Sequence, residues 1–175
     1  AVLQWNEGDV QHSVRWQSEA GVAPPKKVVV ADDTLTADMA FRLASEGTAL
    51  LWRGDFQNAR QLLQAMARRV DRKPRKPAAT LRDAFNQHRL AQSQRARTLG
   101  MLLIPFEAGH VIPLRRAPDV KLACNEAYGR GDETFVASLR ELLGLIGAHE
   151  WRRTGVELPA LGQRIHPHYG VFAPI

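Results

Sequence analysis

The feature that most constrains the fold is an alternation of short apolar runs and amphipathic stretches between residues 27 and 70. The segments 27–31 (KVVVA) and 48–52 (TALLW) are short and apolar, which is typical of buried strands. Residues 36–46 and 55–70 carry apolar side chains at helical spacing. This order predicts a βαβα unit, and the two strands of such a unit are expected to be parallel.

Capping residues mark where the two predicted helices begin and end. Thr36 and Asp55 precede the helical patterns and can accept hydrogen bonds from free backbone N–H groups. Gly47 follows the first helix and tolerates the left-handed conformation that often ends a helix. Asp32 and Asp33 also come after a strand, but no glycine-rich phosphate loop accompanies them, so we interpret them as capping residues.

A basic, proline-containing stretch, DRKPRKPAA at 71–79, cannot continue the second helix, because Pro74 and Pro77 lack backbone N–H donors. It is the strongest linker signal in the chain. The predicted organisation is an N-terminal α/β part at 1–73, a linker at 74–79, a helical part at 80–163 and a lead-in segment at 164–175.

The helical part is expected to contain three helices and one hairpin. The Thr80-Leu-Arg-Asp83 sequence resembles a capping box and opens the first helix. The apolar runs at 101–104 and 111–114 flank a turn-like PFEAGH and predict a hairpin. The whole chain is therefore expected to be α/β to α+β. The three predicted helices span residues 80–98, about 120–128 and 132–151.

Positive charge is concentrated in one segment. Residues 68–97 hold ten Arg or Lys against two Asp, while the rest of the chain holds 14 basic and 16 acidic residues. Such a segment can attract phosphate groups, although a solvated loop and an exposed helix face explain it equally well. No sequence motif for reading bases accompanies it. The candidate phosphate-contacting residues are Arg72, Lys73, Arg75, Lys76, Arg82 and Arg89.

Several functional classes are disfavoured by the sequence. The single cysteine, Cys124, allows neither an internal disulfide nor a zinc site built from several cysteines, and this fits a cytoplasmic protein. No apolar run approaches the length of a membrane span, and the N-terminus lacks the features of a signal peptide. His166 and His168 lie two residues apart, but no further ligand pattern accompanies them, so we predict no metal site. We find no catalytic centre within the chain.

Four stretches together resemble a known family. They are EGTALLWRGDFQNARQLLQAMARRVDRKPRK (46–76), SQRARTLGMLLIPFEAGHVIPLRRAPDV (93–120), SLRELLGLIGAHEWRRTGVELPALG (138–162) and RIHPHYGVFAPI (164–175). They are similar to the N-terminal half of bacterial class I S-adenosylmethionine-dependent methyltransferases whose catalytic domain is of the "methyltransferase small" type.

The resemblance implies an accessory domain and no catalytic motif in this chain. The family's glycine-rich loop, which holds S-adenosylmethionine, and its Asn-Pro-Pro-aromatic motif are both absent here. The methyl donor is therefore expected in a longer protein, with no cofactor in this chain. The implied partners are a catalytic domain of the same chain and an RNA or ribosome-associated substrate that this domain presents.

The last stretch, GVFA at 170–173, is similar to the segment that leads into the catalytic domain of ribosomal RNA guanine methyltransferases. The resemblance makes Tyr169 and Phe172, with His166 and His168, candidates for the substrate side. Packing between domains is an equal alternative for the two aromatic residues. Two other roles are open for the chain: a structural or dimerisation domain that uses Gly144 and Gly147, and an independent small enzyme.

Overall fold

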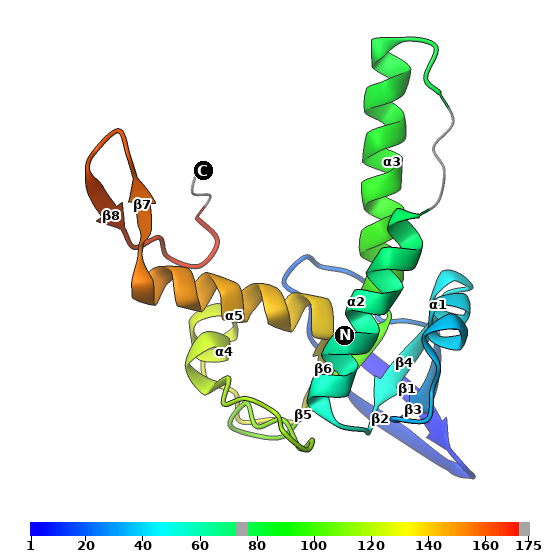
Figure 1. The fold of residues 1–175 in the computed structure, drawn as a ribbon. Helices are drawn as coiled ribbons and strands as arrows, with labels where there is room; N and C mark the ends of the chain where they lie inside the picture. Colours follow the sequence, from blue (N-terminus) through cyan, green and yellow to red (C-terminus); the bar gives the residue numbers. More distant parts are fainter. Residues whose placement is uncertain (73–76, 172–175) are drawn as a thin grey trace.

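The computed structural model describes residues 1–72 and 77–171, and within them the chain forms a mixed α/β fold (Figure 1). The expected α/β class is confirmed at this level. One six-stranded sheet has the order β1-β2-β6-β5-β4-β3, with both parallel and antiparallel neighbours. Its strands are β1 (Val2–Glu7), β2 (Val10–Trp16), β3 (Lys27–Ala31), β4 (Thr48–Trp52), β5 (Leu102–Phe106) and β6 (Phe135–Ser138).

The segment between residues 27 and 71 contains β3, α1 (Ala37–Ser45), β4 and α2 (Phe56–Asp71). Strands β3 and β4 are parallel, and β4 is parallel to β5 on its other side. Both predicted N-caps are present: Thr36 accepts a hydrogen bond from Met39 N, and Asp55 accepts from Gln57 N and Asn58 N. The sheet therefore joins strands from both sides of residues 74–79.

The hairpin predicted around residues 105–110 is reduced to a single antiparallel bridge between Glu107 and Val111. Residues 111–114 form no strand, and β5 pairs instead with β4 and β6. Within the six-stranded sheet, a hairpin forms at the N-terminus, where β1 and β2 are antiparallel. Both of its strands alternate exposed and covered residues in the structure, but one covered position of β2 is the polar His12, so the apolar pattern alone did not predict the hairpin.

The predicted helix over 132–151 is wrong in its first part. Residues 135–138 form strand β6, which pairs with β5 and β2, and α5 (Leu139–Thr154) begins directly after it. Phe135 and Val136 are buried as strand residues, since a short apolar run gives the same signal in a strand and in a helix. Helix α4 (Lys121–Tyr128) is as predicted. Residues 156–165, expected as a loop, include a small ribbon of β7 (Val156–Leu158) and β8 (Gln163–Ile165).

Apolar side chains pack on both faces of the sheet, as the alternation along β4 shows. Leu50 and Trp52 belong to the larger cluster, which also includes residues of α1, α2 and α5. Ala49 and Leu51 point to the other face and pack with a smaller cluster that includes Leu3 of β1. The N-terminal hairpin therefore contributes to the cover of this second face. All four of these β4 residues are almost completely buried.

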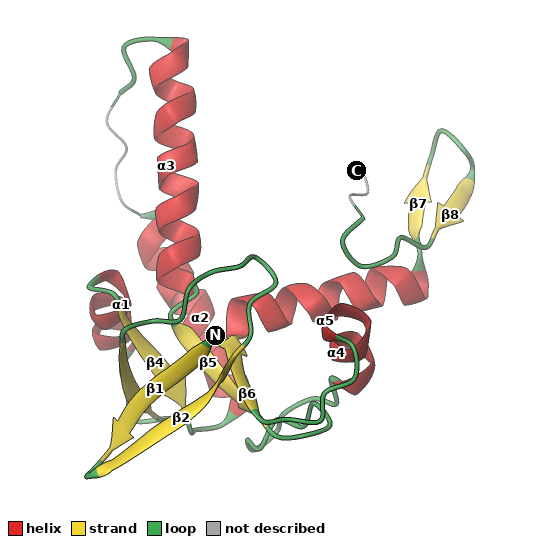
Figure 2. Cartoon of the chain, turned by 180° about the vertical axis from the view of Figure 1, so that it is seen from behind, coloured by secondary structure: helices red, strands yellow, loops and turns green. Residues whose placement is uncertain are grey.

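Helix α3 (Leu81–Leu99) departs from this layered arrangement. Its last residues, Thr98 and Leu99, are buried against the rest of the fold. Its first half extends away from the sheet, and none of the described helices or strands lies beside that half in either view (Figures 1 and 2). We call residues 80–97 of this helix and its cap the arm.

Candidate nucleic-acid interface

The arm is a solvent-exposed helix anchored at one end. Every residue from 77 to 90 is exposed. Thr80 caps the helix by accepting a hydrogen bond from Asp83 N at 3.1 Å, which confirms the predicted start. At the other end, Arg95 Nε lies 2.9 Å from Asp71 Oδ1, so an ion pair joins the end of α2 to the arm. The base of the arm is therefore fixed while its tip is surrounded by solvent.

Basic side chains follow one stripe of the arm. Arg82 and Arg89 are seven residues apart, which places them on the same side of the helix, and Phe85 lies between them. The Arg89 guanidinium carbon lies 5.9 Å from the centre of the Phe85 ring. Neither arginine forms an ion pair with any residue that the structure describes. Their charge is therefore available to an anionic partner.

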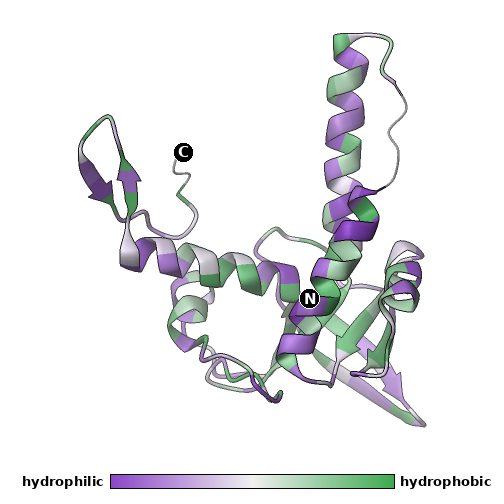
Figure 3. Ribbon diagram, in the orientation of Figure 1, coloured by the Kyte–Doolittle hydropathy of each residue, from purple (hydrophilic) through white to green (hydrophobic). Residues whose placement is uncertain are grey.

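In the sequence, the arm has a thin apolar stripe of Leu81, Ala84, Phe85 and Ala91, but in the structure none of these residues belongs to the buried core. Leu81 is 90% exposed and Phe85 is 60% exposed, so neither contributes to the core. Figure 3 shows mainly hydrophilic colouring along the arm with isolated hydrophobic turns. Ala84 and Ala91 likewise lie outside the buried core. The weak apolar pattern predicted the helix correctly but not its packing.

Of the other predicted basic residues, the structure describes Arg72 alone, at the end of α2. Arg72 is the C-cap of this helix, and its side chain is exposed. Lys73, Arg75 and Lys76 lie outside the described residues. The structure thus brings Arg82 and Arg89 together on one stripe, while Arg72 belongs to the helix that the Arg95–Asp71 ion pair joins to the arm.

Of the predicted substrate-side residues, the structure describes His166, His168 and Tyr169, and the two histidines lie beside α5. Nδ1 of His166 lies 2.7 Å from the carbonyl oxygen of Arg152, and the side chain is exposed. His168 is also exposed and lines a cavity of about 340 Å³ together with Gly144, Gly147 and neighbouring residues of α5. Tyr169 is half-buried against the core, and this burial raises the pKa of its hydroxyl. Phe172 lies outside the described residues.

Gly144 and Gly147 make no close contact with the described residues of the same chain. A Cβ atom added to either glycine would meet no atom within 4 Å. The C-terminal segment forms the other wall of the cavity beside them, leaving open space between. In both views residues 167–171 lie on the side of α5 toward which the arm extends (Figures 1 and 2).

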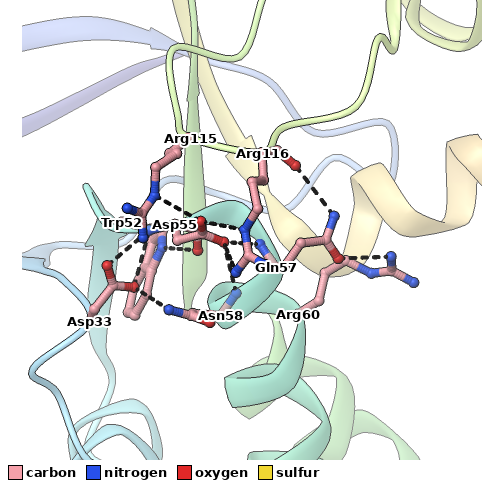
Figure 4. A network of polar contacts seen from close by, with 8 residues as sticks. All are labelled: Asp33, Trp52, Asp55, Gln57, Asn58, Arg60, Arg115 and Arg116. Atoms are coloured by element: carbon pink, nitrogen blue, oxygen red, sulfur yellow. Dashed lines mark hydrogen bonds and ion pairs between the residues drawn. The ribbon is translucent and has the colours of Figure 1, made fainter.

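The most strongly bonded polar cluster was not predicted. Asp55 has no exposed side-chain surface, and two arginines of the loop before α4 reach it (Figure 4). Arg116 donates from Nε at 2.6 Å and from Nη2 at 2.8 Å, and Arg115 donates from Nε at 3.1 Å. The carboxylate of Asp33 accepts from Asp55 N and from Asn58 Nδ2. The sequence predicted Asp55 and Asp33 as capping residues but gave no indication that Arg115 and Arg116 would reach Asp55.

The chemistry of this cluster indicates a structural clamp. Both oxygens of Asp55 accept several hydrogen bonds, and the bonds from Arg116 hold its pKa well below the ordinary range despite the opposing effect of burial. A carboxylate with filled acceptor sites and such a low pKa is a poor proton acceptor. Asp33 therefore accepts hydrogen bonds at the start of α2, and not at the start of α1 as we expected. The Asp55 clamp holds the loop before α4 against the start of α2.

No group of three or more His, Cys, Asp or Glu side chains suited to a metal ion occurs among the described residues. Within the same part of the chain, no helix combines the length and apolar character needed to cross a membrane. Comparisons with protein-family models, with curated proteins and with solved structures found no match to the chain.

Proposed function

We propose that this chain is the pre-catalytic domain of a class I S-adenosylmethionine-dependent methyltransferase, and that it presents RNA to a catalytic domain of the same protein. The proposed family rests on the resemblance of the four stretches 46–76, 93–120, 138–162 and 164–175. The observation that supports RNA as the substrate is the arm, where Arg82 and Arg89 are exposed on one stripe with no carboxylate partner among the described residues.

The arm suits phosphate contact for physical reasons. Guanidinium groups donate several hydrogen bonds in a fixed plane, and phosphate oxygens accept them in pairs. An exposed aromatic ring between two such groups offers a stacking surface that every base can use. Phe85 lies in this position, so the stripe combines electrostatic attraction with a contact that does not depend on sequence.

In the proposed function, the C-terminal segment at 164–171 contacts the catalytic domain. His168 and the half-buried Tyr169 belong to the part of the chain that would meet the catalytic domain, which would also hold S-adenosylmethionine. RNA held by the arm would lie on the same side of α5 as this segment (Figure 1). A ribosome-associated protein with an acidic surface is the alternative substrate for the same basic stripe.

The test is RNA binding by the 175-residue chain, measured by fluorescence anisotropy with a short labelled single-stranded RNA. The Arg82→Gln/Arg89→Gln variant is expected to bind about tenfold or more weakly, since two phosphate contacts are lost. A charge-matched control replaces two exposed arginines outside the arm, Arg42→Gln/Arg130→Gln, and is expected to bind like the parent protein. Equal loss in both variants, or no RNA binding by the parent chain, would refute the proposal.

A structural or dimerisation role is the second candidate, because Gly144 and Gly147 are exposed and face open space on α5. A partner helix could approach this surface closely. Light scattering with size-exclusion chromatography tests this role: a dimer that Gly147→Arg converts to a monomer supports it, and a monomer at all concentrations removes it.

A further inference from the structure

A second cavity, of about 350 Å³, lies at the base of the arm. Its walls are largely apolar, and its volume is within the range of about 300–1,000 Å³ that is usual for small-ligand sites. Three parts of the fold meet there: the loop after β2, the last turns of α3 and the start of α5. The lining includes Trp16, Val22, Pro25, Ala96 and Met101.

The walls of this cavity are held in place by hydrogen bonds. The indole Nε1 of Trp16 donates to the carbonyl oxygen of Val22 at 2.7 Å, so the loop after β2 is tied to the strand. The carboxylate of Glu141 accepts hydrogen bonds from Ser18 Oγ, from Glu19 N and, at 2.6 Å, from Tyr128 Oη. The acceptor sites of Glu141 are therefore used by hydrogen bonds within the protein. These bonds hold the loop after β2 in place as one wall of the cavity.

One buried polar atom in the lining has no hydrogen-bond partner among the described residues. Ser138 is the N-cap residue of α5, but its side chain makes no capping hydrogen bond. Its Oγ is buried and has no hydrogen-bond partner in the structure. An unpaired buried hydroxyl is costly, and a ligand that donates to it or accepts from it would remove the cost. This residue lines the cavity directly.

Two further groups in the lining carry positive charge. Arg97 and Arg140 are both exposed, and neither forms an ion pair with a described residue. Helical spacing continues the stripe of Arg82 and Arg89 through Ser93 and Ala96 into this cavity. The basic stripe of the arm thus leads to the cavity.

We infer that this cavity is a nucleotide-binding site, in which the apolar walls take a base, Ser138 Oγ contacts its hydrogen-bonding edge, and Arg97 and Arg140 bind its phosphate. The inference deepens the proposed function and rests on it, because the base would belong to an RNA chain that continues along the arm. A planar base can pack between the apolar walls and form one hydrogen bond with the hydroxyl. The phosphate of the same nucleotide can accept hydrogen bonds from the two guanidinium groups.

The experiment records amide and indole NMR spectra of the chain with AMP, GMP, CMP or UMP, and with the matching nucleosides. We expect shifts at Trp16, Ser138 and Arg97 with a nucleotide, and weaker binding of the nucleoside, which lacks the phosphate. Ser138→Ala should weaken nucleotide binding about three- to tenfold without lowering the melting temperature, since its hydroxyl makes no hydrogen bond in the protein. Ser45→Ala, at an exposed serine of α1, is the control and should bind like the parent.

The outcomes separate this inference from the proposed function. Salt-dependent RNA binding through the arm, with no nucleotide-induced shift at the cavity, overturns the nucleotide site and leaves the arm intact. Shifts at the cavity with all four nucleotides, together with no binding of RNA, support the cavity and refute the proposed function. Nucleotide binding that is unchanged in both Ser138→Ala and Arg97→Gln/Arg140→Gln also overturns the site.

Discussion

Arg116 donates two hydrogen bonds to the buried carboxylate of Asp55, from Nε to Oδ2 at 2.6 Å and from Nη2 to Oδ1 at 2.8 Å. Asp55 also caps α2, so one side chain joins the start of that helix to the loop before α4. This loop and α2 are distant in the sequence, and the clamp is the main polar connection between them (Figure 4). The clamp leads to the first prediction.

Asp55→Asn is expected to lower the melting temperature at neutral pH, because the amide keeps one acceptor but loses the charge that binds both arginines. The folded-state pKa of Asp55 is lowered, so its contribution to stability is complete above the unfolded-state pKa of about 3.9 and is lost as the pH falls through the folded-state pKa. The difference in melting temperature between parent and variant should therefore shrink below about pH 4. A difference that stays constant from neutral to strongly acidic pH would contradict the ionised clamp.

The Cys124 thiol is expected to be unreactive in the folded protein. The side chain is fully buried, and this burial raises its pKa to about 11. Only about one thiol in a thousand is then ionised at pH 8, and the thiolate is the reactive form. Labelling with a thiol-specific disulfide reagent should be slow in buffer and complete in denaturant. Rapid stoichiometric labelling of the native protein would show that α4 is packed less tightly than described.

Tyr128→Phe tests the wall of the cavity at the base of the arm. Its hydroxyl donates to Glu141 at 2.6 Å, and burial together with this bond raises the pKa of Tyr128 strongly. Loss of a hydrogen bond to a charged group should lower the free energy of unfolding by about 1.5–3 kcal/mol. Urea denaturation measures this value. Faster amide exchange at Gly21 and Val22 is also expected, since Glu141 loses one of the donors that position it.

Phe85→Ala should leave the stability of the fold within about 0.5 kcal/mol of the parent, because this side chain is 60% exposed. The same substitution should weaken RNA binding about fivefold or more through the loss of a stacking surface. Parallel measurements of melting temperature and RNA affinity separate the two effects. A clear loss of stability would show that the arm packs against the fold.

Local signals in the sequence predicted the elements that depend on local chemistry. Thr36, Asp55 and Thr80 cap their helices as expected, because an N-cap is a contact within one turn. The strands at 27–31 and 48–52 both form, because short β-branched and apolar runs favour strands. Strand β4 is buried as predicted, but the prediction that 27–31 is buried is wrong, because β3 lies at the edge of the sheet and Val29 and Val30 are exposed.

The errors arose where pairing over long distances decides the structure. Phe135–Ser138 form a strand because they pair with β5 on one side and with β2 on the other. The local sequence of this run does not distinguish it from the first turn of α5. The Asp55–Arg116 clamp joins residues 61 positions apart, so no local pattern could reveal it. In the sequence Ser138 falls inside the helix predicted over 132–151, and only the structure shows it at the start of α5 with its hydroxyl unpaired among the described residues.

The central claim is that the arm binds RNA through its phosphates, and the salt dependence of binding tests it most directly. Each contact with a single-stranded phosphate contributes about 0.7 to the slope of log affinity against log salt concentration. The account predicts that Arg82→Gln/Arg89→Gln reduces the magnitude of this slope by about 1.4. RNA binding whose affinity and salt slope are the same in the parent and in this variant would contradict the claim.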